Sequence, residues 1–273
     1  MKITIGLPVR NQIRYVRKCI DSIINNTHVS YRLIIVDDNS KNKNYLNEVR
    51  KKVPKNKLEI IENDKQLGFP ETCNLIFQNV RTEYVSIVTS DCIVPSDWLK
   101  PLLASMEKHK KLGVVGPMTS WCSGKQCIQG LLKIRDKMTM DDINEVFTMR
   151  QRLFEGKMKF LDTIMGFCTL FRMKALRDVK ENGYYLDNRF FPGSGEDNDI
   201  CIRLRLKKWL VGIALNSYVH HYGNRTFRAE YKIEGVRKIW NKGKDKTMKK
   251  YPGMLVWQDN PTLINGEYYG RKS

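Results

Sequence analysis

The sequence predicts an α/β fold in which a mostly parallel central sheet is flanked by helices. Short apolar, β-branched runs alternate with amphipathic segments over residues 3–91, an order typical of parallel strands joined by helical crossovers. Two of these runs end abruptly in acids, at Asp37 and at Asp91. Because the carboxyl ends of parallel strands meet at one edge of the sheet, we expect a ligand site at that edge.

The N-terminal elements follow the order strand, helix, strand, helix, strand, helix and strand. Continuous apolar runs indicate buried strands, and apolar residues at helical spacing indicate the helices between them. Pro54 ends the second helix, because proline cannot continue one. Strands are expected at 3–7, 33–36, 58–61 and 84–88, and helices at 13–24, 45–53 and 72–80.

Beyond Asp91 the periodicity is less regular. Pro95-Ser96-Asp97 can cap a helix over 98–109, and a strand follows at 114–116. We interpret residues 119–159 as a variable insertion with one helix that begins near Asp141. The later elements expected are a strand at 163–171, a short helix around Ala175, a helix from Glu196, strands at 210–215 and 217–221, and a weak helix at 230–240.

The composition indicates an anionic partner and a reducing compartment. Lysine and arginine outnumber aspartate and glutamate by 48 to 29, a net charge of +19, which favours phosphate-bearing substrates, acidic lipid headgroups or nucleic acid. The seven cysteines include no C-x-x-C pair and are expected to be free thiols. No apolar run approaches the ~18 residues of a membrane span, so we expect a cytoplasmic protein, at most peripheral at the inner face of a membrane.

The acidic strand ends are the first candidates for chemistry. Asp37-Asp38 can cap a turn or accept hydrogen bonds from a nucleobase or ribose. Asp91 is a candidate metal ligand, because Mg²⁺ and Mn²⁺ prefer carboxylate oxygen and can offset the charge of a diphosphate leaving group. The phosphate-cradling and dinucleotide-binding glycine motifs do not follow the first strand, which argues against kinases and dehydrogenases.

Two further groups lie later in the chain. Glu196-Asp197 follows Gly193 and Gly195 and either caps a helix or presents carboxylates at a cleft wall. A helix N-terminus lowers a carboxyl pKa, so a general base here needs burial or a neighbouring acid to raise it. His220 and His221 are adjacent on a predicted strand and point to opposite faces, so at most one faces the site.

Taken together, these residues resemble the family 2 glycosyltransferases, which have the GT-A fold. Each motif is loose by itself, but the motifs occur in the family's order over residues 3–227. They are Pro8 to Asn11, Asp37-Asp38-Asn39-Ser40, Asn63 with Gly68 and Asn74, Thr89-Ser90-Asp91, Gly166-Phe167-Cys168 ahead of Arg172, Gly195 to Arg203, and His220 with Gly223 and Thr226-Phe227.

The resemblance implies an enzyme that transfers a sugar from a nucleotide-diphosphate donor (UDP-, TDP- or GDP-sugar) to an acceptor hydroxyl with inversion. It implies that Asp197 is the catalytic base, and that Glu196 supports it or contacts the acceptor. It places Gly166 and Phe167 beside the donor sugar and acceptor. The implied contacts to the donor nucleotide are Pro8, Val9, Arg10, Asn11, Asp37, Asp38, Asn63, Gly68, Asn74 and Ser90.

The resemblance also implies a metal site for Mn²⁺ or Mg²⁺, with Asp91 and His220 as ligands and His221 as the less favoured choice. The chain departs from the family pattern at two places. Relatives often carry an acid at the position of Thr89 or Ser90, and often an arginine at the position of Cys73. Because Asp91 is the only acid left in its motif, the histidine is expected to matter more for the metal.

We divide the chain into a GT-A domain over residues 1–227 and a basic, aromatic C-terminal extension over 228–273. Within the domain, residues 1–118 form the nucleotide-binding half, 119–159 the insertion and 160–227 the acceptor and catalytic half. The extension is expected to pack on the domain or to mediate association, which leaves a homodimer open. Its stretch from Lys232 to Lys250 is the expected contact with an anionic membrane.

The expected role is cell-surface glycan or glycoconjugate synthesis, with a glycan, lipid-linked or protein acceptor. One alternative is a basic nucleic-acid-binding protein, suggested by the charge. Acidic strand ends would repel nucleic-acid phosphates, so we expect no nucleic-acid partner. The other alternative is a nucleotidyltransferase on a related sheet, but Gly6-Leu7-Pro8 is not the glycine-rich basic loop such an enzyme would show.

Overall fold

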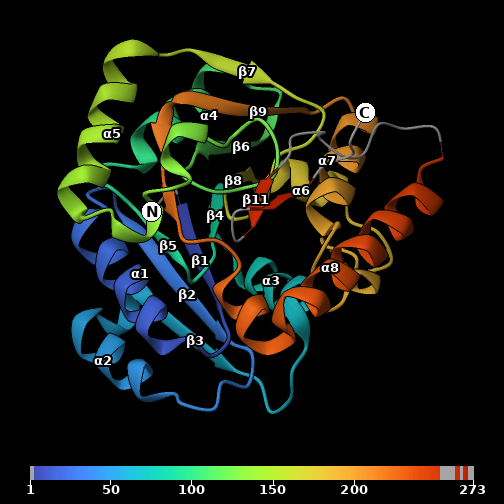
Figure 1. Cartoon of the computed structure of the whole chain (residues 1–273), viewed down its shortest axis with the longest axis horizontal. Coiled ribbons are helices and arrows are strands. Elements are labelled where there is room, and N and C mark those ends of the chain that lie inside the picture. The colour runs from blue at the N-terminus through green and yellow to red at the C-terminus, as the bar shows by residue number, and fades with distance from the viewer. Residues whose placement is uncertain (1–2, 253–261, 265–266, 270–273) are drawn as a thin grey trace.

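The computed structural model describes residues 3–252, 262–264 and 267–269 and is built on an eight-stranded sheet (Figure 1). The strands lie in the order β3-β2-β1-β4-β8-β6-β9-β7, and most neighbouring pairs are parallel, with β8 and β7 running against their neighbours. The strands are β1 (Ile3–Val9), β2 (Tyr31–Asp37), β3 (Leu58–Glu62), β4 (Tyr84–Val88), β6 (Leu112–Met118), β7 (Met158–Phe160), β8 (Cys168–Arg172) and β9 (Leu210–Tyr218).

Helices cover both faces of the sheet because both faces are apolar. One face packs against α1 (Ile13–Asn26), α2 (Asn44–Lys52) and α4 (Leu99–Lys108). The opposite face packs against α3 (Gly68–Asn79), α6 (Met173–Asp178) and α7 (Glu196–Leu206). Helix α1 shows the pattern behind this packing. Its buried Val16, Ile20 and Ile23 recur every three or four residues and so form one apolar face. The predicted α/β fold with a mostly parallel, helix-flanked sheet is therefore confirmed.

The strand register brings the predicted loops to one edge. Val9 pairs with Asp37, and Asp37 pairs with Glu62, so β1, β2 and β3 end side by side. Beyond β4, the short strand β5 (Cys92–Ile93) pairs with β10 (His220–His221) in a separate two-stranded sheet. This small sheet brings residues near position 220 to the end of β4.

Two elements differ from expectation, and one agrees with it. The strand predicted over 163–171 begins only at Cys168, and residues 163–167 form a loop beside α7. The helix expected near Asp141 in the insertion is α5 (Met140–Leu153), and the segment before it folds back onto the end of β6 through Thr119 and Gln126. The weak helix predicted over 230–240 is part of the longer α8 (Arg225–Lys250), which has non-helical backbone angles at Lys232.

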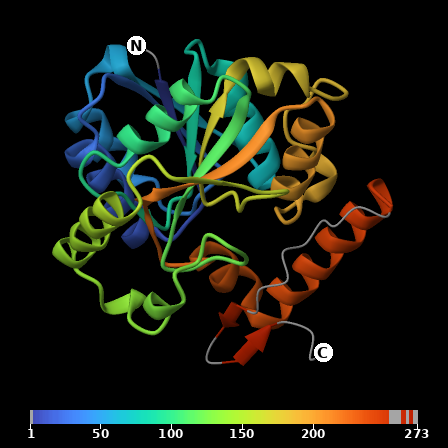
Figure 2. The ribbon, with the colours of Figure 1, turned by 90° about the horizontal axis from the view of Figure 1, so that it is seen from above.

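Helix α8 lies along the carboxyl edge of the sheet (Figure 2). In this view the parallel strands run down toward α8 and the short hairpin of β11 (Thr262–Ile264) and β12 (Glu267–Tyr269). The rest of the predicted extension, residues 253–261, 265–266 and 270–273, lies outside the described residues. Among the helices that are described, none is both long and apolar enough to span a bilayer.

Candidate active site

Asp91 lies in the tight turn between β4 and β5, and His221 faces it from β10. The pairing of His221 with Cys92 in the small sheet places the imidazole Nε2 3.2 Å from Asp91 Oδ1. Ligand atoms of Asp91, Cys92 and His221 all lie within 4.8 Å of one another, and the three side chains are buried. A buried oxygen and nitrogen donor set of this kind fits a divalent cation.

The structure reverses the expected preference between the two histidines. His220 points away from Asp91, with its Nδ1 3.0 Å from the Ser120 hydroxyl and 3.2 Å from the Tyr218 hydroxyl. The reason is the alternation of a β-strand, which sends neighbouring side chains to opposite faces. His221 is therefore the residue that can share a ligand with Asp91, and His220 belongs to the packing behind it.

Asp91 is held as a carboxylate by its surroundings. Burial alone would raise its pKa, but the neighbouring His221, the backbone N–H of Arg225 and the Thr89 hydroxyl outweigh burial and lower it to about 2. The Arg225 N–H donates to Asp91 Oδ2 over 3.1 Å. An ionised oxygen at this strand end is the state that a metal ligand requires.

Glu196 and Asp197 begin α7, directly after Gly195, whose positive φ of 94° suits glycine. Asp197 accepts hydrogen bonds from the backbone N–H groups of Asn198 (2.8 Å) and Gly166 (3.3 Å). These contacts lower its pKa, but burial outweighs them and raises it, and burial with the neighbouring Asp197 also raises the pKa of Glu196. The pair thus meets the condition for a general base near neutral pH.

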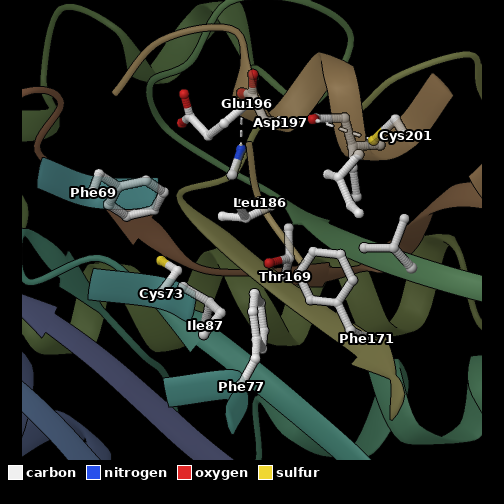
Figure 3. Close-up of a pocket in the computed structure, with 14 residues that line it drawn as sticks. Phe69, Cys73, Phe77, Ile87, Thr169, Phe171, Leu186, Glu196, Asp197 and Cys201 are labelled. Atoms are coloured by element: carbon white, nitrogen blue, oxygen red, sulfur yellow. Dashed lines mark hydrogen bonds between the residues drawn. The ribbon is translucent and has the colours of Figure 1, made fainter. Parts of the chain in front are cut away.

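A small cavity lies beneath the two carboxylates, between α3, α7 and the strands β4 and β8 (Figure 3). Its volume of about 20 Å³ is room for a water molecule but not for a sugar ring. Its walls are mostly apolar, with Cys73 and Cys201 on two sides. Glu196 is 7% exposed, and its Oε2 has no hydrogen-bond partner among the described residues.

Gly166 and Phe167 connect the two acidic groups. The Gly166 N–H points at Asp197, and the Phe167 ring stacks on His221 with the ring centroids 5.0 Å apart. The Phe167 carbonyl accepts from the Thr89 N–H (2.8 Å), which ties this loop to the end of β4. The structure therefore brings Asp91, Gly166, Phe167 and Asp197 together with His221, where the motif series had favoured His220.

The loop after β1 carries Arg10 and Asn11, and both bind Glu230 of α8. Arg10 Nε donates to Glu230 Oε2 over 2.9 Å, and Asn11 Nδ2 donates to Oε1 over 2.5 Å. Arg10 also donates to the Asp38 carbonyl (2.6 Å), which fixes its guanidinium at the edge of β2. Arg10 and Asn11 are both partly exposed beside α8. They therefore form the candidate surface for the donor nucleotide.

The carboxylates of Asp37 and Asp38 accept hydrogen bonds from other groups of the protein. Asp37 is fully buried and accepts from the Ser40 N–H (2.8 Å) and the Tyr45 hydroxyl (2.7 Å). Asp38 is 3% exposed and accepts from the side chain of Asn63 and the backbone N–H groups of Leu67 and Gly68, at 2.7–3.1 Å. Of the two uses considered from the sequence, the turn cap is the one the structure shows.

The other predicted nucleotide contacts fall in two groups. Pro8 and Val9 are buried in β1, and Ser90 is buried beside Asp91, close to the edge where the loops meet. Asn74 does not join them. Its side chain, fully buried, binds the backbone of Tyr185 and Leu186 and so fastens α3 to the segment that leads to α7.

Several residues of the site were not predicted. Glu230 and Tyr231 come from α8, where Tyr231 accepts from Gln66 (3.0 Å), and Cys92 lies in the metal cluster. Gln126 accepts from the Met165 N–H (2.7 Å) and supports the loop before Gly166. No local pattern marks Glu230, Tyr231 or Gln126, since each acts through a partner far away in the sequence.

The fold, the acidic strand end at Asp91 and the buried pair on α7 define a glycosyltransferase of the GT-A fold. The chain belongs to glycosyl transferase family 2, because the model of that family, described as "Glycosyl transferase family 2", matches residues 4–180. The family assignment favours this class over the nucleic-acid-binding and nucleotidyltransferase alternatives. The match ends before α7, so Glu196, Asp197 and His221 lie outside the matched range.

Curated relatives match in part. Glycosyltransferase GlyA of Streptococcus pneumoniae serotype 4 is 28% identical over 116 residues, which are 42% of this chain and 16% of the relative. An uncharacterized glycosyltransferase of Haemophilus influenzae is 25% identical over 119 residues, 43% of this chain and 36% of the relative. The matched part thus spans little more than a third of these relatives at most.

Solved structures match over most of the chain. Residues 1–349 of S. aureus TarS in complex with UDP-GlcNAc superpose with a TM-score of 0.60 at 16% identity, covering 88% of this chain and 65% of that one. GalNAc-T7 with UDP, GalNAc and Mn²⁺ gives a TM-score of 0.61 at 13% identity, covering 92% and 51%. At these identities the likeness shows the shared fold.

Proposed function

We propose that this chain transfers a sugar from a nucleotide-diphosphate donor to an acceptor hydroxyl with inversion at the anomeric carbon. The observation that carries the proposal is the placement of Asp197 and the Asp91–His221 pair on either side of Gly166-Phe167. A proton acceptor and a site for an anionic leaving group then stand a short loop apart. A direct displacement needs both groups at one site.

In this proposal Asp197 takes the proton of the acceptor hydroxyl as that oxygen attacks the anomeric carbon. The new bond forms opposite the bond to the donor phosphate, which breaks and releases the nucleotide diphosphate. The Gly166 N–H orients the Asp197 carboxylate, and buried Glu196 keeps a second carboxyl beside it. The raised pKa of Asp197, due to burial, makes it a better base than an exposed aspartate.

Asp91 and His221 would hold the divalent cation, which when bound offsets charge on the leaving diphosphate. The nitrogen ligand favours Mn²⁺ over Mg²⁺, because Mg²⁺ prefers an all-oxygen shell. The presence of Mn²⁺ in the GalNAc-T7 structure supports the same choice. Arg10 and Asn11 are the proposed donor contacts, with Asp37, Asp38, Asn63 and Gly68 shaping the loop around them.

The donor is proposed to be a UDP-sugar, since UDP and UDP-GlcNAc are bound in structures of the same fold. A glycan, lipid-linked or protein acceptor in cell-surface glycan synthesis, and a cytoplasmic place at the inner face of a membrane, are further parts of the proposal. The net charge of +19 and the exposed lysines of α8 support the contact with an anionic surface.

Thermal unfolding with candidate donors tests the proposal. We expect one of the UDP-, TDP- or GDP-sugars to raise the melting temperature with Mn²⁺ and to raise it less without it, because a ligand of the folded state stabilises that state. The stabilising sugar should then be consumed when acceptors are added, with release of the nucleotide diphosphate. Indifference to every nucleotide sugar would contradict the proposed donor class.

Glu230→Gln is expected to tighten binding of UDP. The carboxylate competes for Arg10 and Asn11, and glutamine keeps its shape without its charge. Since the ion pair is partly exposed, we expect a gain of roughly two- to five-fold in affinity by calorimetric titration.

The matched control is Glu234→Gln, an exposed position one turn further along α8, which should leave the affinity unchanged. Weaker UDP binding by Glu230→Gln would instead mean that Glu230 is itself a ligand of the nucleotide.

A further inference from the structure

The end of α8 is in direct backbone contact with the turn that carries the catalytic pair. Gly243 is packed so closely that a Cβ added to it would lie 2.2 Å from the carbonyl oxygen of Ser194. A Cβ on Gly195 would lie 2.9 Å from the Thr247 hydroxyl and 3.0 Å from the Gly243 carbonyl. No side chain larger than hydrogen fits between the two segments. Helix and turn therefore meet as one packed unit immediately before Glu196.

A buried ion cluster fixes the same end of α8 to the first turn of α7. Asp199 is fully buried and accepts from Lys250 Nζ, the Tyr251 hydroxyl and Arg203 Nη2, each at 2.8 Å. Lys250 also lies 2.7 Å from Glu181 and 3.1 Å from Asp187. Although burial alone would lower it, these acids raise the pKa of Lys250, so the cluster holds its charge. Charged groups paired this closely in a partly buried place fix geometry as well as contributing energy.

The other end of α8 is held at the donor loop. Thr226 donates to the Arg10 carbonyl (3.2 Å), and Glu230 and Tyr231 bind Arg10, Asn11 and Gln66. The irregular backbone at Lys232 lies between the two attachments. Since each end is tied to a different part of the site, α8 cannot shift without moving one of them.

We infer that residues 243–251, the last two turns of α8 and the following Tyr251, are a positioning element for Asp197. The backbone contact at Gly243 holds the turn at Ser194 and Gly195, and the ion pair of Lys250 with Asp199 holds the first turn of α7. Together they fix the backbone on both sides of Asp197. These residues act through Asp197 and are not placed to touch a substrate. The inference rests on the proposed function for the role of Asp197, but the mechanical coupling can be measured without activity.

Gly243→Ala is the direct test, with Lys242→Ala as the matched control, because it introduces the same residue at the exposed preceding position of the helix. The added methyl group must push the helix away from Ser194. We expect faster amide hydrogen exchange at Glu196, Asp197 and Asn198 in Gly243→Ala. In Lys242→Ala the exchange rates should equal those of the wild type. Unchanged exchange in both variants would overturn the inference, whatever the activity.

Kinetics supply the second readout. A displacement of about 1 Å at a catalytic group costs on the order of 10²-fold in rate, so kcat should fall by about that factor while KM for the donor stays the same. The acid limb of the kcat profile should also move to lower pH as the turn opens and the burial of Asp197 decreases. If Gly243→Ala lowers the melting temperature but leaves kcat and its pH profile unchanged, the contact at Gly243 serves only stability. That result would contradict the inference.

If Gly243→Ala does not fold, Lys250→Gln and Lys250→Arg replace it. The glutamine removes the charge that three acids share, and the arginine restores it. We expect the glutamine variant to show the faster exchange around Asp197 and the arginine variant to reverse most of it. An inactive wild-type enzyme with this exchange pattern would refute the proposed function and leave the positioning role standing.

Discussion

Asp197→Asn is expected to lower kcat by about 10²- to 10⁴-fold, the usual contribution of a general base. Asparagine has nearly the same shape, and its oxygen can still accept one of the two backbone hydrogen bonds from Asn198 and Gly166. It cannot accept a proton from the acceptor. Donor affinity should change little, because the proposed donor contacts Arg10 and Asn11 lie in the loop after β1, whereas Asp197 lies in the first turn of α7. Single-turnover transfer and UDP titration measure the two effects separately.

The pH profile of the native enzyme gives an independent check. Asp197 is an active base only when ionised, and burial raises its pKa. The rate should therefore rise with pH through a range above that of an ordinary aspartate. Asp141→Asn, an exposed site at the start of α5, is the control and should match the native enzyme. Full turnover by Asp197→Asn would remove it from the role of base.

Asp91→Asn is expected to abolish stimulation by Mn²⁺ and to weaken metal-dependent donor binding by on the order of 100-fold. Loss of an outer-shell partner alone typically costs 10- to 100-fold in metal affinity, and loss of a ligand should cost no less. The variant keeps the hydrogen bond from the Arg225 N–H but lacks the charge opposite His221. The measurement is the Mn²⁺ dependence of the UDP-induced thermal shift.

Asp21→Asn, at a surface ion pair with Lys52, controls for loss of charge elsewhere. His220→Asn should affect Mn²⁺ stimulation much less than His221→Asn, because only His221 reaches Asp91. Equal loss in both histidine variants would show that the site depends on packing rather than on a ligand pair. Normal metal response in Asp91→Asn would place the cation elsewhere.

The first half of the fold could be predicted from the sequence because its signals are local. Each buried strand is a continuous apolar run, and each helix has its own periodicity, so β1 to β4 and α1 to α3 agree with expectation within a few residues. The prediction of a strand over 163–171 was wrong for its first five residues. Residues 163–167 are apolar enough for a strand, but they form a loop. Its backbone N–H groups at Gly166 and Met165 donate to the side chains of Asp197 and Gln126.

The site could be predicted where a reactive residue type coincides with the end of a predicted element. Asp91 follows the end of a strand, and Asp197 lies at the start of a helix. The structure brings the two residues into one region through the Gly166-Phe167 loop. The choice of His221 over His220 depends on the register in which β10 pairs with β5, a contact between residues more than 120 positions apart. Glu230 and Arg10 are 220 positions apart in the sequence. The spacing of charged residues along a helix does not show which distant residue will pair with one of them.

The contact between Glu230 and Arg10 has a consequence for selectivity. A carboxylate held by the folded chain next to its partner acts like a ligand at an effective concentration of about millimolar or above. In the proposed donor site, every incoming nucleotide competes with this internal ligand for Arg10 and Asn11. A nucleoside without phosphates carries no negative charge and cannot displace the Glu230 carboxylate from Arg10. A nucleoside diphosphate carries the negative charge that this displacement needs. Helix α8 thereby sets a threshold of anionic charge for entry to the site.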